Sequence, residues 1–159
     1  MSVAFTKEED SESNAANLLD RPISPNANLV TASGLAALDA ALAQARADYA
    51  AAQVQGSVSA DRTAMARATR DLRYYSARRA SAQLVAPSDD PDKVAFGGTV
   101  TFEREDGRRQ TFRIVGEDEA DPAKGAVSYV SPLARALLGK AVGDVAMVAG
   151  GEVEVMRVE

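Results

Sequence analysis

The feature that most limits how this chain can fold is a row of apolar residues spaced alternately three and four positions apart. Its members are Leu35, Leu38, Leu42, Ala45, Tyr49 and Ala52. This spacing puts them all on one side of an α-helix of about 20 residues, roughly 30 Å long. Thr31 precedes the row and is suited to cap the helix N-terminus. The chain is therefore predicted to contain a long helix whose apolar side needs a partner.

A second helix with a matching apolar row follows after a short break. The break is Gln53–Ser59, in which Gly56 is predicted to end the first helix and Ser59 to cap the second. The second row contains Met65, Ala68, Leu72, Tyr75 and Ala82. Two amphipathic helices joined by so short a loop, the second ending near Val85, form an antiparallel hairpin. Because its seam is rich in alanine, the outer end is expected to be mobile.

The C-terminal part of the sequence has the pattern of β-strands. Asp106-Gly107 is predicted to be the turn of a hairpin between Thr99–Arg104 and Arg109–Val115. Further strands are expected at 126–130, 144–148 and 151–158. The predicted fold class is therefore α+β, with an N-terminal antiparallel helical hairpin, or coiled coil, and a C-terminal β-rich domain.

One short helix is predicted to interrupt these strands. Ser131 suits the N-cap, Pro132 suits the first helical position, and Gly139 suits the left-handed residue that ends the helix. Leu133, Leu137 and Leu138 share its apolar side. Packing into the core is the simpler interpretation of these three leucines.

Four consecutive parts are predicted along the chain. Residues 1–30 are polar, acid-leaning and interrupted by Pro22 and Pro25, so they are expected to be extended or disordered in isolation. The remaining parts are a hairpin at 31–86, a proline-containing linker at 87–93 and the β-rich domain at 94–159.

The composition excludes several kinds of chemistry. The sequence has no cysteine and no histidine, so it offers no disulfide, no thiolate metal site and no imidazole base. Its net charge is −5, but residues 31–86 carry +3 between flanks of −3 and −5. This basic middle is the part expected to face an anionic partner. Because there is no membrane-spanning run and no signal-peptide pattern, a cytoplasmic protein without membrane contact is expected.

The C-terminal motifs resemble those of a known family. Ser-Pro-Leu-Ala-Arg-Ala-Leu-Leu-Gly at 131–139, followed by Val-Gly-Asp at 142–144, is similar to the signature of the bacterial GreA/GreB transcript-cleavage factors. Residues 112–116 and 118–122 resemble the same family, as does the order of segments from Thr31 onward. The resemblance implies a C-terminal domain similar to the FK506-binding proteins, RNA polymerase as the partner, and a hairpin that enters the polymerase secondary channel.

In that family, two acidic residues at the hairpin tip help to hold a catalytic magnesium ion in the polymerase, which then hydrolyses its own backtracked RNA. Magnesium prefers such hard oxygen ligands. Here the stretch from Gln53 to Met65 contains one acid, Asp61, while Asp48 and Asp71 lie about two turns away. No catalytic residue is predicted, Asp61 being the one candidate, and its simpler role is to complement the helix dipole. No cofactor is expected, and magnesium enters only if cleavage is stimulated, held mainly by the polymerase.

Two sets of residues are candidates for binding a partner. The first set comprises Arg62, Arg67, Arg70, Arg73, Arg78 and Arg79. Spacings of three put Arg67, Arg70 and Arg73 along one stripe within a solvated helix side. The set either contacts RNA or an acidic channel wall or simply keeps the helix soluble. The second set, Ser131, Pro132, Leu133 and Arg135, matches the signature of the domain that docks on the polymerase. Arg135 is expected to be exposed and is the preferred interface residue.

Three functions remain open at this point. The first is a monomeric RNA polymerase-binding factor, and not an enzyme, that regulates elongation through the secondary channel without stimulating cleavage. The 3′ end of nascent RNA is a further candidate partner. The second is a true cleavage factor that uses Asp61, and the third is a module for a partner other than polymerase, similar to the regulator of nucleoside diphosphate kinase. Prolyl isomerase activity is not expected, because the domain's four aromatic residues are about what a small core uses.

Overall fold

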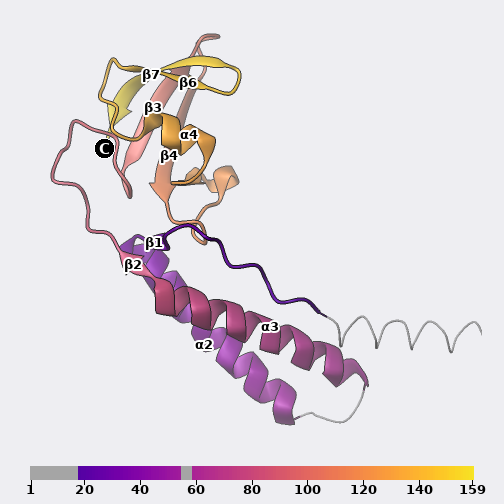
Figure 1. Ribbon diagram of the computed structural model, residues 1–159. Helices are drawn as coiled ribbons and strands as arrows, with labels where there is room; N and C mark the ends of the chain where they lie inside the picture. Colours follow the sequence, from indigo (N-terminus) through magenta and orange to yellow (C-terminus); the bar gives the residue numbers. More distant parts are fainter. Residues whose placement is uncertain (1–17, 55–58) are drawn as a thin grey trace, which may run out of the picture. The chain divides into compact units, whose positions relative to one another are not determined.

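The computed structural model describes residues 18–54 and 59–159, with side chains at 18–54 and 62–159. Its two long helices are α2 (Ala32–Val54) and α3 (Ser59–Ser81), which form the predicted hairpin (Figure 1). Gly56 and the side chain of Ser59, predicted to end one helix and cap the other, lie outside the described residues. Within the described part, no helix is both long and apolar enough to cross a bilayer.

The seam of the hairpin lies where the alternating spacing predicts it. The buried residues of the seam are Leu38, Leu42, Ala45 and Ala52 of α2 and Ala68 of α3. Met65, Leu72 and Tyr75 of α3 are half-buried. Alanine lets the two helices approach closely but removes little apolar area from water, so each turn of the seam contributes less stability than a leucine-rich seam.

The end of α3 differs from the sequence expectation. The helix ends at Ser81 rather than near Val85, because the next residues pair as a strand. This strand, β2 (Gln83–Leu84), runs parallel to β1 (Leu29–Val30), and the backbone N–H of Val85 donates to a β1 carbonyl at 3.0 Å. Pairing with a segment far away in the sequence therefore overrides the local helical pattern.

The C-terminal part is a five-stranded sheet in the order β5-β4-β3-β7-β6 (Figure 1). The strands are β3 (Thr99–Arg104), β4 (Arg109–Val115), β5 (Ala126–Ser128), β6 (Val145–Val148) and β7 (Gly151–Val158). All neighbours are antiparallel except β4 and β5, which are parallel and are connected through the short helical turn η1 (Pro122–Lys124). β3 and β4 have the predicted bounds, and Gly107 in their turn has a φ of 83°, which side-chain-bearing residues rarely adopt.

One face of this sheet and the helix α4 (Pro132–Leu137) enclose the core. The fully buried residues alternate with more exposed ones along β3 and β7, as a sheet with one covered face requires, whereas Ile114 and Val115 at the end of β4 are both fully buried. The buried strand residues of the core include Val100, Phe102, Ile114, Val153 and Val155. Ala134 and Leu137 of α4 complete the core. The C-terminal domain is thus a mixed sheet with one short helix, as predicted.

Capping residues determine where the short helix α4 begins and ends. The Ser131 hydroxyl accepts a hydrogen bond from the Ala134 N–H at 3.2 Å, and Pro132 occupies the first turn. Gly139, just after the helix, has a φ of 82°. All three roles are those predicted from the sequence, because they depend only on residues within one turn.

Contacts divide the described residues into two compact units. One contains 18–25 and 38–81, and the other contains 26–37 and 82–159. These units interleave along the sequence, whereas the predicted parts, 1–30, 31–86, 87–93 and 94–159, are consecutive. The start of α2 groups with the sheet because the Thr31 hydroxyl donates to Glu119 Oε2 at 2.6 Å.

Candidate functional site

Four arginines form a basic surface on α3, here called the arginine face. It consists of Arg62, Arg67, Arg70 and Arg73. Arg70 is half-buried and the other three are exposed. Its acidic neighbours include Asp20, whose Oδ1 lies 3.2 Å from Arg73 Nη1, and Asp71, whose Oδ1 lies 3.8 Å from Arg70 Nε. The face is therefore positively charged and open to solvent over most of its members.

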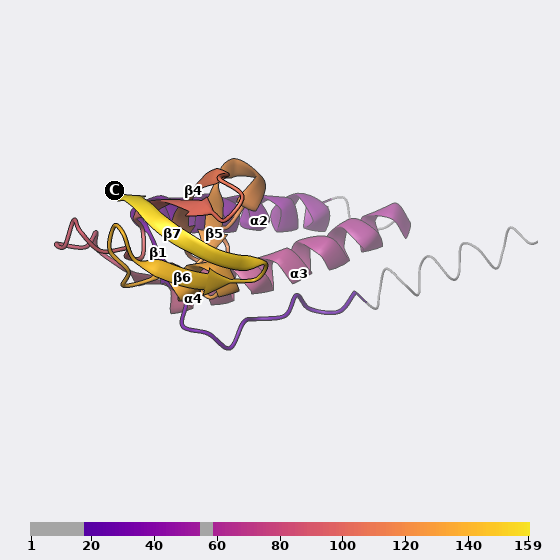
Figure 2. The same ribbon diagram turned by 90° about the horizontal axis from the view of Figure 1, so that it is seen from above.

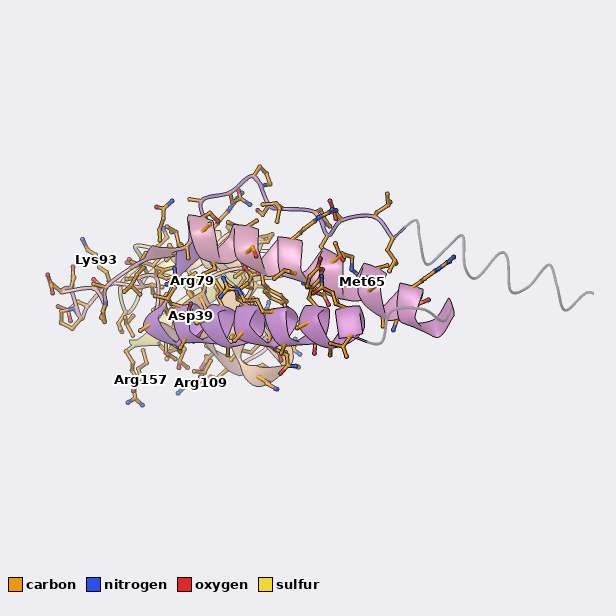
Figure 3. All side chains as sticks on the ribbon, turned by 90° about the horizontal axis from the view of Figure 1, so that it is seen from below. Asp39, Met65, Arg79, Lys93, Arg109 and Arg157 are labelled. Carbon is orange, nitrogen blue, oxygen red and sulfur yellow. The ribbon has the colours of Figure 1, made fainter. Side chains whose placement is uncertain are left out.

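The last two arginines of α3 have other surroundings. Arg78, a further member of the candidate set, is only 2% exposed and is therefore not on the solvent-facing side of the helix. A guanidinium buried to this degree requires hydrogen-bond partners and belongs to the framework of the hairpin. Arg79 forms an ion pair with Asp39 of α2, and Figure 3 shows their side chains pointing toward one another.

Residues 18–25, here called the docked segment, run beside α3 (Figures 2 and 3). Asp20 Oδ1 accepts a hydrogen bond from Arg73 Nη1 at 3.2 Å, and Arg21 Nη1 donates to Asp71 Oδ1 at 3.4 Å. The sequence predicts disorder for this region in isolation. Its contacts come from a helix some fifty residues further along the chain, which local patterns cannot show.

Arg21 is the best-held side chain of the docked segment. Its guanidinium carbon lies 3.8 Å from the centroid of the Tyr74 ring and 5.1 Å from that of Tyr75. Desolvation alone would lower the pKa of Arg21, but the hydrogen bond to Tyr75 and the nearby Tyr74 and Asp71 outweigh it and raise this pKa above its ordinary value. Arg21 is therefore a permanent cation held on an aromatic surface.

A cleft opens between the docked segment and the arginine face. It has a volume of about 410 Å³ and is lined by Leu18, Asp20, Arg62, Met65, Ala66, Thr69, Arg70 and Arg73. The lining of the cleft thus contains three guanidinium groups and one carboxylate. The excess positive charge suits an anionic group that enters from solvent. Arg67, the fourth member of the arginine face, is outside this cleft.

The carboxylates near the hairpin tip are only partly described. Asp61 lies in α3, but its side chain is outside the described residues. Asp48 accepts a hydrogen bond from Gln44 at 2.8 Å, and Asp71 is paired with Arg21. Among the residues that the structure describes, no group of three or more acidic side chains is arranged to hold a metal ion.

The second predicted set of binding residues surrounds α4. Pro132 and Arg135 are exposed, Ser131 and Leu133 are half-buried, and Leu133 packs against the core. The Ser131 hydroxyl is already engaged in capping. Arg135 is thus exposed, as expected from the sequence, and its role in binding stays a prediction.

An exposed apolar strip on the same domain was not predicted. Val142, Val145 and Met147 are 59%, 50% and 68% exposed. Val145 and Met147 lie on the face of β6 opposite the buried Ala146. The signal was present in the sequence, since alternation places two large apolar residues on the outer side of an edge strand.

Glu119 is a structural residue that the sequence analysis missed. Its two carboxylate oxygens accept hydrogen bonds from the hydroxyls of Thr31 and Ser33, both at 2.6 Å. Arg113 Nη1 lies 3.6 Å from the same carboxylate. A Cβ on Gly34 would come within 2.6 Å of Glu119 Oε2. Glu119 thus complements the positive end of α2, and Gly34 leaves room for it.

These features define a class of protein: a small α+β chain in which a helical hairpin with a basic side precedes a mixed β-sheet domain. Residues 88–159 match the family described as transcription elongation factor, GreA/GreB, C-term. This C-terminal part of the chain is therefore similar to the GreA/GreB transcription elongation factors, which agrees with the resemblance seen in its C-terminal motifs.

Curated relatives match over part of this chain. The transcription elongation factor GreA of Hyphomonas neptunium is 57% identical over 58 residues, covering 36% of this chain and 37% of that protein. GreA of Desulfovibrio desulfuricans is 44% identical over 75 residues, or 46% of each chain. GreB of Neisseria meningitidis serogroup B is 40% identical over 96 residues, or 57% of this chain and 59% of that one. The chain spans about half the length of the curated relatives it matches.

Two solved structures were also found to be similar. GreA factor homolog 1 of Thermus thermophilus has a TM-score of 0.39 and 21% identity, covering 84% of this chain and 99% of that one. GreA/GreB from Nitrosomonas europaea has a TM-score of 0.38 and 20% identity, covering 82% and 97%.

Proposed function

We propose that this chain binds RNA polymerase and regulates transcription elongation from the secondary channel without stimulating RNA cleavage. The match of residues 88–159 to the GreA/GreB family supports the polymerase as partner. Its arginine face supports a hairpin that works in an anionic environment, where RNA phosphates or acidic protein walls are the neighbours. The proposal includes a monomeric protein that acts in the cytoplasm, with the 3′ end of nascent RNA as a second contact.

The proposal that cleavage is not stimulated rests on the small number of carboxylates near the hairpin tip. Between Asp48 and Asp71 the sequence contains a single acid, Asp61. Magnesium needs several hard oxygen ligands, and the family mechanism takes two of them from the hairpin tip. Asp48 and Asp71 are engaged with Gln44 and Arg21. The factor would therefore occupy the channel without completing a metal site, and any hydrolysis would remain the polymerase's own chemistry.

The docking surface in this proposal is the exposed part of α4 and its N-cap. Arg135 and Pro132 are exposed there, and Leu133 is half-buried. An exposed arginine beside apolar side chains is a common composition of a protein interface. The domain beneath it is well packed, so it presents this surface on a rigid support.

Co-purification with bacterial core RNA polymerase tests the proposal. We expect the full chain to form a complex with core polymerase on size-exclusion chromatography, and to change the rate of RNA extension on a defined template. Absence of any complex would overturn the proposal and favour a partner other than polymerase. Shortening of backtracked RNA that depends on Asp61 would instead favour a true cleavage factor.

A further inference from the structure

The docked segment offers α3 the same two kinds of group that single-stranded RNA offers a protein, an anion and a flat π-electron system. Asp20 supplies the anion and Arg21 the flat group, and the two are adjacent in sequence. We propose that residues 18–25 are an internal mimic of single-stranded RNA, that they cover an RNA-binding site on the arginine face, and that their release opens this site.

The first half of the mimic is an electrostatic contact. Both carboxylate oxygens of Asp20 face Arg73 Nη1, at 3.2 and 3.5 Å. A phosphate of a nucleic-acid backbone is likewise an anion that accepts hydrogen bonds from an arginine guanidinium group. The carboxylate of Asp20 thus stands where a phosphate would bind.

The second half is a stacking contact. The Arg21 guanidinium lies 3.8 Å from the centre of the Tyr74 ring, which is the separation of stacked planar groups. Tyr74 and Tyr75 form an edge-to-face pair, with ring centroids 5.2 Å apart and planes at 81°. Tyrosine rings on a basic surface are the usual platform on which proteins stack unpaired bases. Arg21 therefore covers the ring face that a base would use.

The cleft extends this site beyond the covered part. Arg62, Arg70 and Thr69 line it together with Asp20 and Arg73. An RNA strand that replaced Asp20 with a phosphate would find further guanidinium and hydroxyl donors for the next phosphate along the same helix. The mimic thus occupies only the portion of the site nearest Arg73 and Tyr74.

The contacts of the docked segment are suited to exchange. The side chains of Arg73 and Asp20 are 66% and 62% exposed, and ion pairs in such surroundings are weak. The pair of Arg21 with Asp71 is also partly open to solvent. A multivalent anion can therefore displace the segment, since it replaces one carboxylate with several phosphates.

The aromatic pair favours RNA over an acidic protein surface as the competing partner. An acidic wall would use the guanidinium groups of the arginine face but would gain nothing from the Tyr74 ring. A single strand uses both. An acidic protein partner is kept as an outcome of the test.

The loss of a positive charge and the release of the docked segment should change the RNA affinity of an Arg21→Ala variant of the full chain in opposite directions. Removing a positive charge should weaken RNA binding, whereas releasing the segment should strengthen it. We expect R21A to bind a labelled single-stranded RNA of about 12 nucleotides about three- to tenfold more tightly at low salt, the ratio set by the fraction of molecules in which the site is free. Fluorescence anisotropy measures the affinity, and Arg46→Ala, an exposed arginine on α2, is the control that should not gain. Adding Arg73→Ala or Tyr74→Ala to R21A should remove the gain.

A tethered variant tests the same site without removing Arg21. The sequence has no cysteine, so Leu18→Cys with Met65→Cys gives a single pair that a reducible bismaleimide-type linker can join across the cleft. We expect RNA binding to be lost when the linker is closed and to return when it is cleaved. Far-UV circular dichroism of both proteins shows whether the hairpin is folded.

Equal or weaker RNA binding by R21A with a folded hairpin would overturn the proposal, as would unchanged binding in the closed tethered protein. A gain by R21A for core polymerase but none for RNA would also overturn it and would point to an acidic protein partner. The RNA measurement contains no polymerase, so its failure and the failure of the proposed polymerase function are separate results.

Discussion

The hairpin and the C-terminal domain bury their apolar residues in different ways. The domain encloses Phe102, Ile114 and Leu137, each 1% exposed or less, whereas the buried seam of the hairpin is mostly alanine around Leu38 and Leu42. The domain is thus built for stability and a fixed surface. The hairpin buries a thinner seam, and α3 is rich in arginine and carries two adjacent tyrosines.

The largest expected effect is the loss of stability when a large core side chain is truncated in each of the two regions. Phe102→Ala should destabilise the C-terminal domain by about 3–5 kcal/mol, because it removes a fully buried ring from a closed core. Leu42→Ala in the hairpin should cost about 2–3 kcal/mol, at the low end for leucine, since the alanine-rich seam can close around the loss. Urea unfolding followed by circular dichroism measures both. A smaller loss for Phe102→Ala than for Leu42→Ala would break the comparison.

The next effect tests the capping of α2 by a residue from the second half of the chain. Glu119→Ala should cost about 1–2 kcal/mol, because two hydroxyls and one guanidinium lose their acceptor. Glu119→Gln keeps the shape and one good acceptor, so it should cost less. Thermal unfolding distinguishes them. Equal stability of wild type and the alanine variant would show that this cluster contributes nothing to the fold.

The next prediction concerns the affinity of the C-terminal domain for core polymerase. Arg135→Glu should weaken the complex with core polymerase about tenfold, or about 1.4 kcal/mol, while the fold stays intact. Lys124→Glu reverses a charge at another exposed position of the same domain and should leave affinity unchanged. If the two variants behave alike in a binding titration with folded protein, α4 is not the docking surface.

The smallest effect concerns the turn of the β3–β4 hairpin. The backbone N–H and side chain of Arg108 hold the pKa of Asp106 below its ordinary value of 3.8. A lowered folded-state pKa means that the contribution of Asp106 to stability is present above its ordinary pKa and is lost as the pH falls through the lowered value. A carboxyl NMR titration should show a midpoint below 3.8 for Asp106, and Arg108→Ala should move it back up. A midpoint at or above the ordinary value would remove this turn from the stabilising contacts.

Most of the fold could be predicted from the sequence, because it is encoded by short-range chemistry. The seam of α2, the Asp106-Gly107 turn and the caps of α4 each depend on residues within a few positions of one another. The parallel pairing that ends α3 at Ser81 depends on a strand more than fifty positions earlier, and no local pattern signals it.

The candidate site was less predictable for the same physical reason. Helical spacing places Arg67, Arg70 and Arg73 along one side of α3, but spacing alone does not show that Arg78 is buried. The contact of Arg21 with Tyr74 joins two residues that only the folded hairpin brings together. The sequence of the docked segment, polar and without periodicity, is that of a chain whose structure depends on a partner surface.

Cleavage of RNA in a defined backtracked complex tests the central claim most directly. Saturating amounts of this chain should bind core polymerase and alter the rate of extension. The 3′-labelled RNA should be shortened no faster than in a control complex that receives magnesium alone. Rapid shortening of the RNA that disappears in Asp61→Ala would contradict the claim, because it would show that one acid in this hairpin completes a metal site.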